Sequence, residues 1–299
     1  MIDLFQSGDI ISASRRTDIP RFYSKWFLKR LEEGFVLVRN PFNPNQIRRV
    51  SLKPEDVSVI VFWTRDASPL FGKLPELLKR YRIAFLWTIT GYGPPLELAD
   101  IPITKTVENF IKTSEIVGAK KMVWRYDPIT ITDKFSPEWH IENFARISES
   151  IKHFTCRVIV SLMTPYASVR KRLERAGIEF DRTPLENPEV KNMLREISDI
   201  AKQNGQEIQA CSQAGKLSPF GIPDGACIDS RWLSEIFGIA LPHRKDRGQR
   251  PECLCTKSID IGAYNTCPGG CLYCYAVKSI RAAREFFAKF DHNNPGLWR

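Results

Sequence analysis

Three cysteines stand close together near the end of the chain. In the segment SIDIGAYNTCPGGCLYCYAVKS, residues 258–279, Cys267, Cys271 and Cys274 have the spacing C-x3-C-x2-C. Iron–sulfur clusters are bound by cysteine thiolates, and a four-iron cluster usually takes four of them. Three thiolates would leave one iron open to a small molecule. The intervening Pro-Gly-Gly allows the tight turns that a loop around a compact cluster requires.

Two other chemistries fit these thiols. Zinc could be held by Cys253 and Cys255 together with Cys271 and Cys274, because zinc accepts four thiolates. Cys271 and Cys274 also form a C-x-x-C pair, which is the pattern of a redox-active dithiol. The strand and helix expected on either side of the three-cysteine segment favour the iron–sulfur cluster.

The remaining cysteines suggest a second metal site. Cys211 closes an expected strand, Cys227 follows a glycine-containing turn, and Cys253 and Cys255 precede the last expected strand. These four could hold a second four-iron cluster or a zinc ion, or they could be unligated thiols, since their spacings are irregular. Cys156 opens a strand and is expected to pack as a small hydrophobe.

Three expected strands end in an arginine closely followed by an aspartate. The segments are SRRTD with Arg16 and Asp18, TRD with Arg65, and RYD with Arg125 and Asp127. In parallel barrels the active site lies at the carboxyl ends of the strands. Such a rim could bind a zwitterion, because guanidinium groups match a carboxylate and aspartates accept hydrogen bonds from an amine or a hydroxyl. Ordinary salt bridges are the alternative.

The elements that must position these residues are short apolar runs with helical patterns between them. Continuous apolar character is typical of strands that are covered on both faces of a parallel sheet. The expected strands are 9–13, 58–63, 84–89, 121–125, 157–162, 207–211 and 258–264. Repeated strand–helix units predict an α/β barrel or a doubly wound sheet.

The chain is expected to form one domain, residues 1–299. This length suits a single α/β barrel, and a hydrophobic content of 43% is enough for a large core. Three regions stand out: a hairpin insertion at 35–52, a cysteine-containing loop region at 212–256, and a cluster-binding strand–loop–helix unit at 258–290.

The net charge of +10 allows a polyanionic partner such as nucleic acid. The densest positive group, hereafter the basic loop, is residues 242–255, PHRKDRGQRPECLC, and a solvated surface loop is its simpler interpretation. No run is long enough to span a membrane and the N-terminus does not resemble a signal peptide, so we expect a cytoplasmic protein without a membrane partner. In that compartment cysteines are usually thiols or metal ligands.

The cysteine spacing, Tyr273 before the third cysteine and the preceding strand resemble the cluster loop of radical S-adenosylmethionine (SAM) enzymes. Over the whole chain, IISASRRTDIPRFY and C-x-C-x-x-SIDIGAYNTCPGGCLYCYA resemble the uncharacterised prokaryotic family catalogued as domain of unknown function 1848. The first resemblance implies a 4Fe-4S cluster whose open iron chelates S-adenosylmethionine, followed by reductive cleavage and hydrogen abstraction from an unknown substrate. It also implies an electron donor such as flavodoxin or ferredoxin. The expected cofactor contacts are Tyr273, Arg16, Asp18, Arg65, Arg125 and Asp127.

In those enzymes the cluster loop usually follows the first barrel strand, whereas here it follows the last. A circular permutation reconciles the two orders, because the ends of a barrel chain are often close in space. We therefore expect a partial parallel (β/α) barrel resembling the radical SAM barrel, circularly permuted, with strand 258–264 parallel to and beside strand 9–13. The alternative function is a zinc-stabilised, non-catalytic barrel that binds nucleic acid. A radical enzyme acting on nucleic acid, like the spore photoproduct lyases, would combine the two, and the sequence assigns no catalytic residue.

Overall fold

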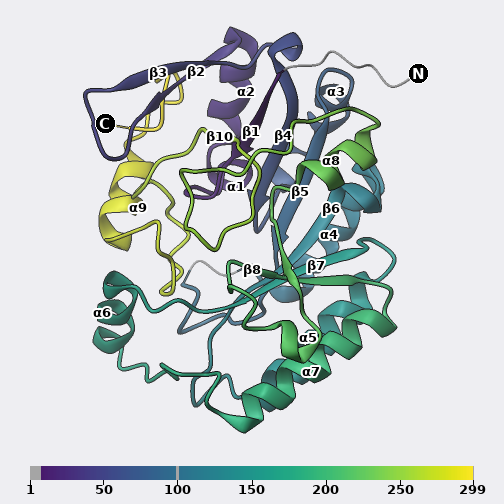
Figure 1. Cartoon of the computed structure of the whole chain (residues 1–299). Coiled ribbons are helices and arrows are strands. Elements are labelled where there is room, and N and C mark those ends of the chain that lie inside the picture. Colours follow the sequence, from purple (N-terminus) through teal and green to yellow (C-terminus); the bar gives the residue numbers. More distant parts are fainter. Residues whose placement is uncertain (1–7, 99–100, 299) are drawn as a thin grey trace.

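Eight parallel strands form the main sheet of this protein (Figure 1). The computed structural model describes residues 8–98 and 101–298. Within them, the strand order is β10-β1-β4-β5-β6-β7-β8-β9, and every neighbouring pair is parallel, which makes an open half-barrel. The strands are β1 (Asp9–Ala13), β4 (Val57–Thr64), β5 (Ile83–Thr88), β6 (Met122–Ile129), β7 (Arg157–Leu162), β8 (Glu207–Cys211), β9 (Asp224–Gly225) and β10 (Ile259–Asp260).

Both faces of the sheet are buried, which explains the continuous apolar runs. All eight residues of β4 are buried. Ile60 and Phe62 belong to the core under the helices, whereas Val59 and Val61 point into a second core on the inner face. Because successive side chains of a strand point to opposite faces, each central strand must be apolar at every position.

Helices cover the outer face of the sheet. They include α2 (Ser24–Glu33), α4 (Ile103–Val117), α5 (Pro137–Ile151) and α7 (Pro188–Gln203), whose buried residues share the outer core. Ser136 caps α5 by accepting a hydrogen bond from the Trp139 amide, with Pro137 in the first turn. The other helices are α1 (Ile19–Phe22), α3 (Leu74–Leu78), α6 (Ala167–Arg175), α8 (Ser230–Phe237) and α9 (Ile280–Ala288).

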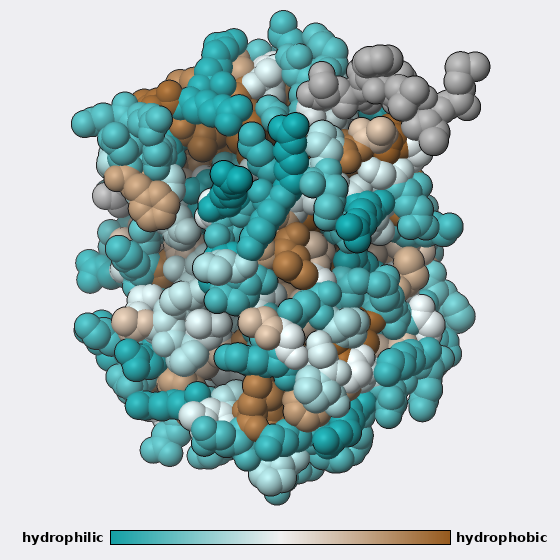
Figure 2. Space-filling model, viewed as in Figure 1, coloured by the Kyte–Doolittle hydropathy of each residue, from teal (hydrophilic) through white to brown (hydrophobic). Residues whose placement is uncertain are grey.

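The inner face is covered by the segment that joins β9 to β10. Ile228, Leu233 of α8, Cys253 and Cys255 pack there against the inner residues of β1, β4, β5 and β6. The loops of this segment cross in front of the strands in Figure 1. The same face in Figure 2 is mainly hydrophilic, with small separate apolar patches, so it presents mostly polar groups.

Most expected elements agree with the structure. Strands 9–13, 157–162 and 207–211 have the expected bounds, and the insertion at 35–52 is an antiparallel hairpin of β2 (Phe35–Arg39) and β3 (Ile47–Ser51). The expected strand 258–264 is longer than the observed one, because only Ile259 and Asp260 are strand residues. They pair in parallel with Ile11 and Ser12 of β1, so the expected neighbour and direction are confirmed.

No helix among the described residues combines the length and the apolar character needed to cross a bilayer.

Candidate metal centre

The cysteine loop, residues 261–279, joins β10 to α9 and carries Cys267, Cys271 and Cys274. Since β10 runs parallel to the other strands, this loop leaves the sheet at the rim that holds their carboxyl ends. Cys271 forms an isolated antiparallel bridge with Glu97, and the Leu272 amide donates to the Leu96 carbonyl at 2.8 Å. The segment after β5 therefore holds the loop over the rim.

Arg172 of α6 fixes the loop from the other side. Its Nε donates to the carbonyl of Leu272 at 2.9 Å, and its two terminal nitrogens donate to the carbonyls of Cys274 and Val277. One guanidinium thus satisfies three backbone acceptors of a loop that has little regular structure. Arg172 could not be predicted from the sequence, because a single arginine on a surface helix carries no local signal.

Two of the three thiols of the loop accept hydrogen bonds from backbone amides. Cys267 accepts from the backbone amides of Asp18 and Gly269, and Cys274 accepts from those of Ala276 and Val277. Burial raises the pKa of Cys271 to about 11, and it also raises the pKa values of the other two. These thiols would keep their protons at neutral pH unless a metal replaces them.

A buried ion pair lies beside Cys271. Both terminal nitrogens of Arg65 donate to the Glu97 carboxylate, at 2.8 and 2.7 Å, and Thr90 Oγ1 donates to the same carboxylate at 2.5 Å. The hydroxyl of Tyr273 contacts both Arg65 and Glu97. Arg65 therefore lies beside the loop that carries Tyr273, and its ion-pair partner is Glu97, which was not among the residues predicted from the sequence.

A cavity of about 140 Å³ adjoins this ion pair. Arg65, Thr90, Glu97 and Cys271 line it together with Gly91, whose φ of +74° and closeness to Asn143 leave no room for a side chain. Pockets for whole small molecules usually measure about 300–1,000 Å³. This cavity could therefore admit one polar end of a ligand.

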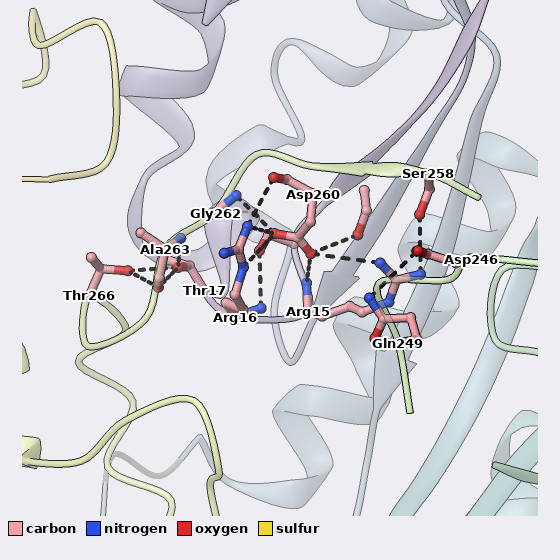
Figure 3. Close-up of polar contacts among 12 residues, drawn as sticks. Arg15, Arg16, Thr17, Asp246, Gln249, Ser258, Asp260, Gly262, Ala263 and Thr266 are labelled. Carbon is pink, nitrogen blue, oxygen red and sulfur yellow. Dashed lines mark hydrogen bonds and ion pairs between the residues drawn. The ribbon is translucent and has the colours of Figure 1, made fainter. Parts of the chain in front are cut away.

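Arg16 forms an ion pair with Asp260, which follows it by 244 residues in the sequence. Figure 3 shows the Asp260 carboxylate between Arg15 and Arg16 at the end of β1. It accepts from Arg16 Nε at 3.1 Å and from the Arg15 amide at 2.8 Å, and further donors are Ser12, Ser14 and Gly262. Burial opposes ionisation, but Arg16 and Arg15 lower the pKa of Asp260. This carboxylate joins the last strand to the first.

Asp18 accepts hydrogen bonds from two neighbouring elements of the fold. It caps α1 by accepting from the Arg21 amide, and it accepts from Thr64 Oγ1 at 2.6 Å and from the Arg65 amide at 3.0 Å. Burial raises its pKa to about 6, against the effect of these hydrogen bonds. Asp18 therefore connects the start of α1 to the end of β4.

Arg125 forms an ion pair with Asp127, two residues later in the same strand. Asp127 also accepts from Ser161 of β7. The guanidinium of Arg125 lies 4.6 Å from the ring centroid of Trp63, and that of Arg15 lies 5.2 Å from the same ring. The rim arginines thus already have partners within the protein.

The four cysteines Cys211, Cys227, Cys253 and Cys255 lie close together. The sulfurs of Cys211 and Cys227 are 3.4 Å apart, and Cys255 hydrogen-bonds with both Cys227 and Cys253. Donation from Cys227 and Cys253 lowers the pKa of Cys255. The zinc alternative that combined Cys253 and Cys255 with the cysteine loop is less favoured by this grouping.

As the side chains stand within residues 8–98 and 101–298, no group of three or more His, Cys, Asp and Glu could hold a metal ion. The ligands of a single ion must lie close to one point, whereas the cysteines that bind an iron–sulfur cluster are farther apart because they surround several metal atoms. The donor set of the cysteine loop, with three partly buried cysteines and four backbone amides facing two of them, fits a thiolate-ligated cluster.

Cys156 is exposed just before β7, so the expectation that it packs in the core is wrong, because the strand begins one residue later.

The basic loop exposes four cationic residues, Arg244, Lys245, Arg247 and Arg250. Their exposure is compatible with an anionic partner and equally with a solvated loop.

No curated protein and no solved structure matches this chain. One family model, described as a domain of unknown function (DUF1848), matches residues 10–276, which extend from the first strand to the third cysteine of the loop and beyond. A match over most of the chain shows the family, and the protein therefore belongs to the DUF1848 family.

Proposed function

We propose that this protein is a radical SAM-like enzyme that uses a 4Fe-4S cluster bound by Cys267, Cys271 and Cys274. The observation that carries the proposal is the position of these cysteines. They lie on one loop at the carboxyl rim of a parallel half-barrel, where the active sites of such folds lie. When bound, the cluster would supply an open iron for S-adenosylmethionine and the electron for its reductive cleavage.

A circular permutation of the radical SAM barrel is part of this proposal. Its support is the parallel pairing of β10 with β1, which puts the last strand of the chain next to the first. With β10 counted as the first strand, the sheet order follows the chain order from β10 through β1 and β4 to β8, apart from the separate hairpin.

The residues around the loop would stabilise the cluster ligands and bind the cofactor. The amides of Asp18, Gly269, Ala276 and Val277 would stabilise thiolate charge on two cysteines, as hydrogen bonds to cluster ligands do. The cavity beside Cys271 would receive a polar end of the cofactor, and Thr90 and the paired Arg65 and Glu97 line it.

The rim arginines provide further donors for an anionic group. Among the described residues, buried Nη1 of Arg15 and buried Nε of Arg125 have no hydrogen-bond partner. A buried donor without an acceptor is costly, so a bound carboxylate or other anion would relieve both. Arg125 is therefore a proposed cofactor contact, as expected from the sequence, and Arg15 is proposed as another.

The test begins with anaerobic, iron-replete expression. The wild-type protein should be brown and should contain about four more irons and four more sulfides per chain than the variant C267A/C271A/C274A. After reduction with dithionite, or by a flavodoxin or ferredoxin, it should convert S-adenosylmethionine to 5′-deoxyadenosine and methionine. The triple variant should not.

Cys156→Ala is the matched control, because it removes an exposed thiol outside both groups of cysteines. It should keep the iron, the colour and the cleavage activity. Colourless wild-type protein with stoichiometric zinc would refute the cluster. An intact, reduced cluster that leaves S-adenosylmethionine uncleaved would refute the radical chemistry.

A further inference from the structure

We propose that Cys211, Cys227, Cys253 and Cys255 form a second, separate metal centre of the tetrathiolate type. It would hold a thiophilic metal as either a zinc ion or an iron–sulfur cluster. The proposal does not depend on the radical chemistry proposed for the cysteine loop. Its ligands are distinct from Cys267, Cys271 and Cys274, and its test is carried out in their absence.

The fold gathers these four cysteines from distant parts of the sequence. Cys211 ends β8, Cys227 follows β9, and Cys253 and Cys255 belong to the segment that covers the inner face before β10. The 3.4 Å between the sulfurs of Cys211 and Cys227 is close to the edge of a zinc–thiolate tetrahedron, about 3.8 Å for a zinc–sulfur distance of 2.3 Å. Cys227 and Cys253 both lie near enough to Cys255 to lower its pKa, and all four cysteines therefore belong to one group.

The surroundings of the sulfurs are suited to a negatively charged group. Arg15 interacts with Cys255, Arg125 with Cys211 and Cys227, and Arg250 with Cys211 and Cys253. A zinc ion with four thiolates carries a net charge of about −2, and a four-iron cluster in its common oxidised state carries the same.

Two buried nitrogen donors also favour a negatively charged group at this site. Among the described residues, Nη1 of Arg15 and Nε of Arg125 are buried without a hydrogen-bond partner, and Nη1 of Arg15 lies 4.0 Å from the Asp260 carboxylate. The Ile228 amide, in addition, donates to Cys255 Sγ at 3.4 Å, as backbone amides do around metal-bound thiolates. Cysteines that were only filling an apolar core would not require this set of donors.

The side chains must adjust for a metal to bind. As the side chains stand in the described part of the chain, no three of these sulfurs are arranged to hold one metal ion, and the thiols interact with one another from Cys211 through Cys227 and Cys255 to Cys253. Each thiol that coordinates a metal loses its proton, which removes these S–H contacts. Rotation about the Cα–Cβ bonds would then direct the sulfurs to one metal.

The experiment uses the full-length variant C267A/C271A/C274A, in which only the proposed second centre and Cys156 retain thiols. It is prepared once with zinc and once anaerobically with iron and sulfide, and its metals are measured per chain. We expect about one zinc in the first preparation, or about four irons with equal sulfide in the second. The preparation that fills the site distinguishes the two metals. Adding C227S/C255S should reduce the bound metal at least tenfold, whereas adding C156S should leave it unchanged.

A second measurement covers the case in which the added substitutions prevent folding. Cobalt(II) added to the metal-free triple variant should give the visible absorption bands of a tetrahedral thiolate site. Removing the metal with a chelator should lower Tm by roughly 5–10 °C. A folded triple variant that retains no metal from either preparation and gives no such cobalt spectrum would overturn the proposal.

Discussion

Asp260 is the residue whose replacement tests the architecture of the rim most directly. Its carboxylate lies 3.0 Å from Arg16 Nη2, and the side chains of Asp260 and Arg16 are 13% and 11% exposed. Asp260→Asn keeps the shape but removes the charge, and it puts an NH2 group where the present neighbours are all donors. Breaking a buried, hydrogen-bonded ion pair typically costs about 3–5 kcal/mol, and we expect a loss in this range.

The assay is urea unfolding of the full-length protein at pH 7. The matched control is Asp199→Asn, which removes the same charge from an exposed pair with Lys202 whose ion-pair distance is 3.8 Å. Such surface pairs contribute about 0–1 kcal/mol, so the control should unfold almost like the wild type. Because Asp260 attaches β10 to β1, the variant should also bind less iron on the cysteine loop.

The pH dependence gives a second check on Asp260. Its pKa is lowered from an ordinary value of 3.8, so its ionised form stabilises the folded state fully above that value. The stabilisation is lost as the pH falls below about 4, through the lowered pKa. The difference in unfolding free energy between wild type and variant should therefore be constant from pH 7 to about 5 and shrink in acid. A variant within about 1 kcal/mol of the wild type at pH 7, or a difference that persists unchanged in acid, would refute the reasoning.

The remaining predictions concern the loop, the ion pair and the basic loop. A Cβ on Gly262 would lie 2.0 Å from Ser14 Oγ and 2.6 Å from Ser14 Cβ. Gly262→Ala should therefore lower the free energy of unfolding by about 1–3 kcal/mol. Gly72→Ala is the control and should leave it unchanged, because a Cβ there would have no atom within 4 Å. Glu97→Gln should cost about 3–5 kcal/mol in the same assay, because Arg65 loses its charged partner, and a loss below 1 kcal/mol would contradict this. The nucleic-acid alternative predicts that single-stranded nucleic acid binds and that neutralising the exposed cations of the basic loop reduces the salt dependence of affinity. Fluorescence anisotropy at several salt concentrations measures this, and undetectable binding at low salt would eliminate it.

The strands were predictable from local sequence because their burial on both faces leaves a continuous apolar run. Strands 9–13, 157–162 and 207–211 were predicted with their observed bounds for that reason. The last strand was less predictable, since Gly262 and the hydrogen bonds of Asp260 turn the chain away after two residues, although the apolar pattern continues.

The sequence by itself determined the spacing of Cys267, Cys271 and Cys274, because one loop carries all three and no other part of the chain is needed to bring them together. Only the tertiary structure decided which charges meet. Asp260 lies 244 residues after Arg16, and Glu97 lies 32 residues after Arg65, yet each is the partner of that arginine. Ion-pair partners depend on which strand ends and loops are neighbours at the rim, and no local pattern contains that information. The grouping of Cys211, Cys227, Cys253 and Cys255 has the same origin, since the fold must bring the end of β8 to the segment that covers the inner face of the sheet.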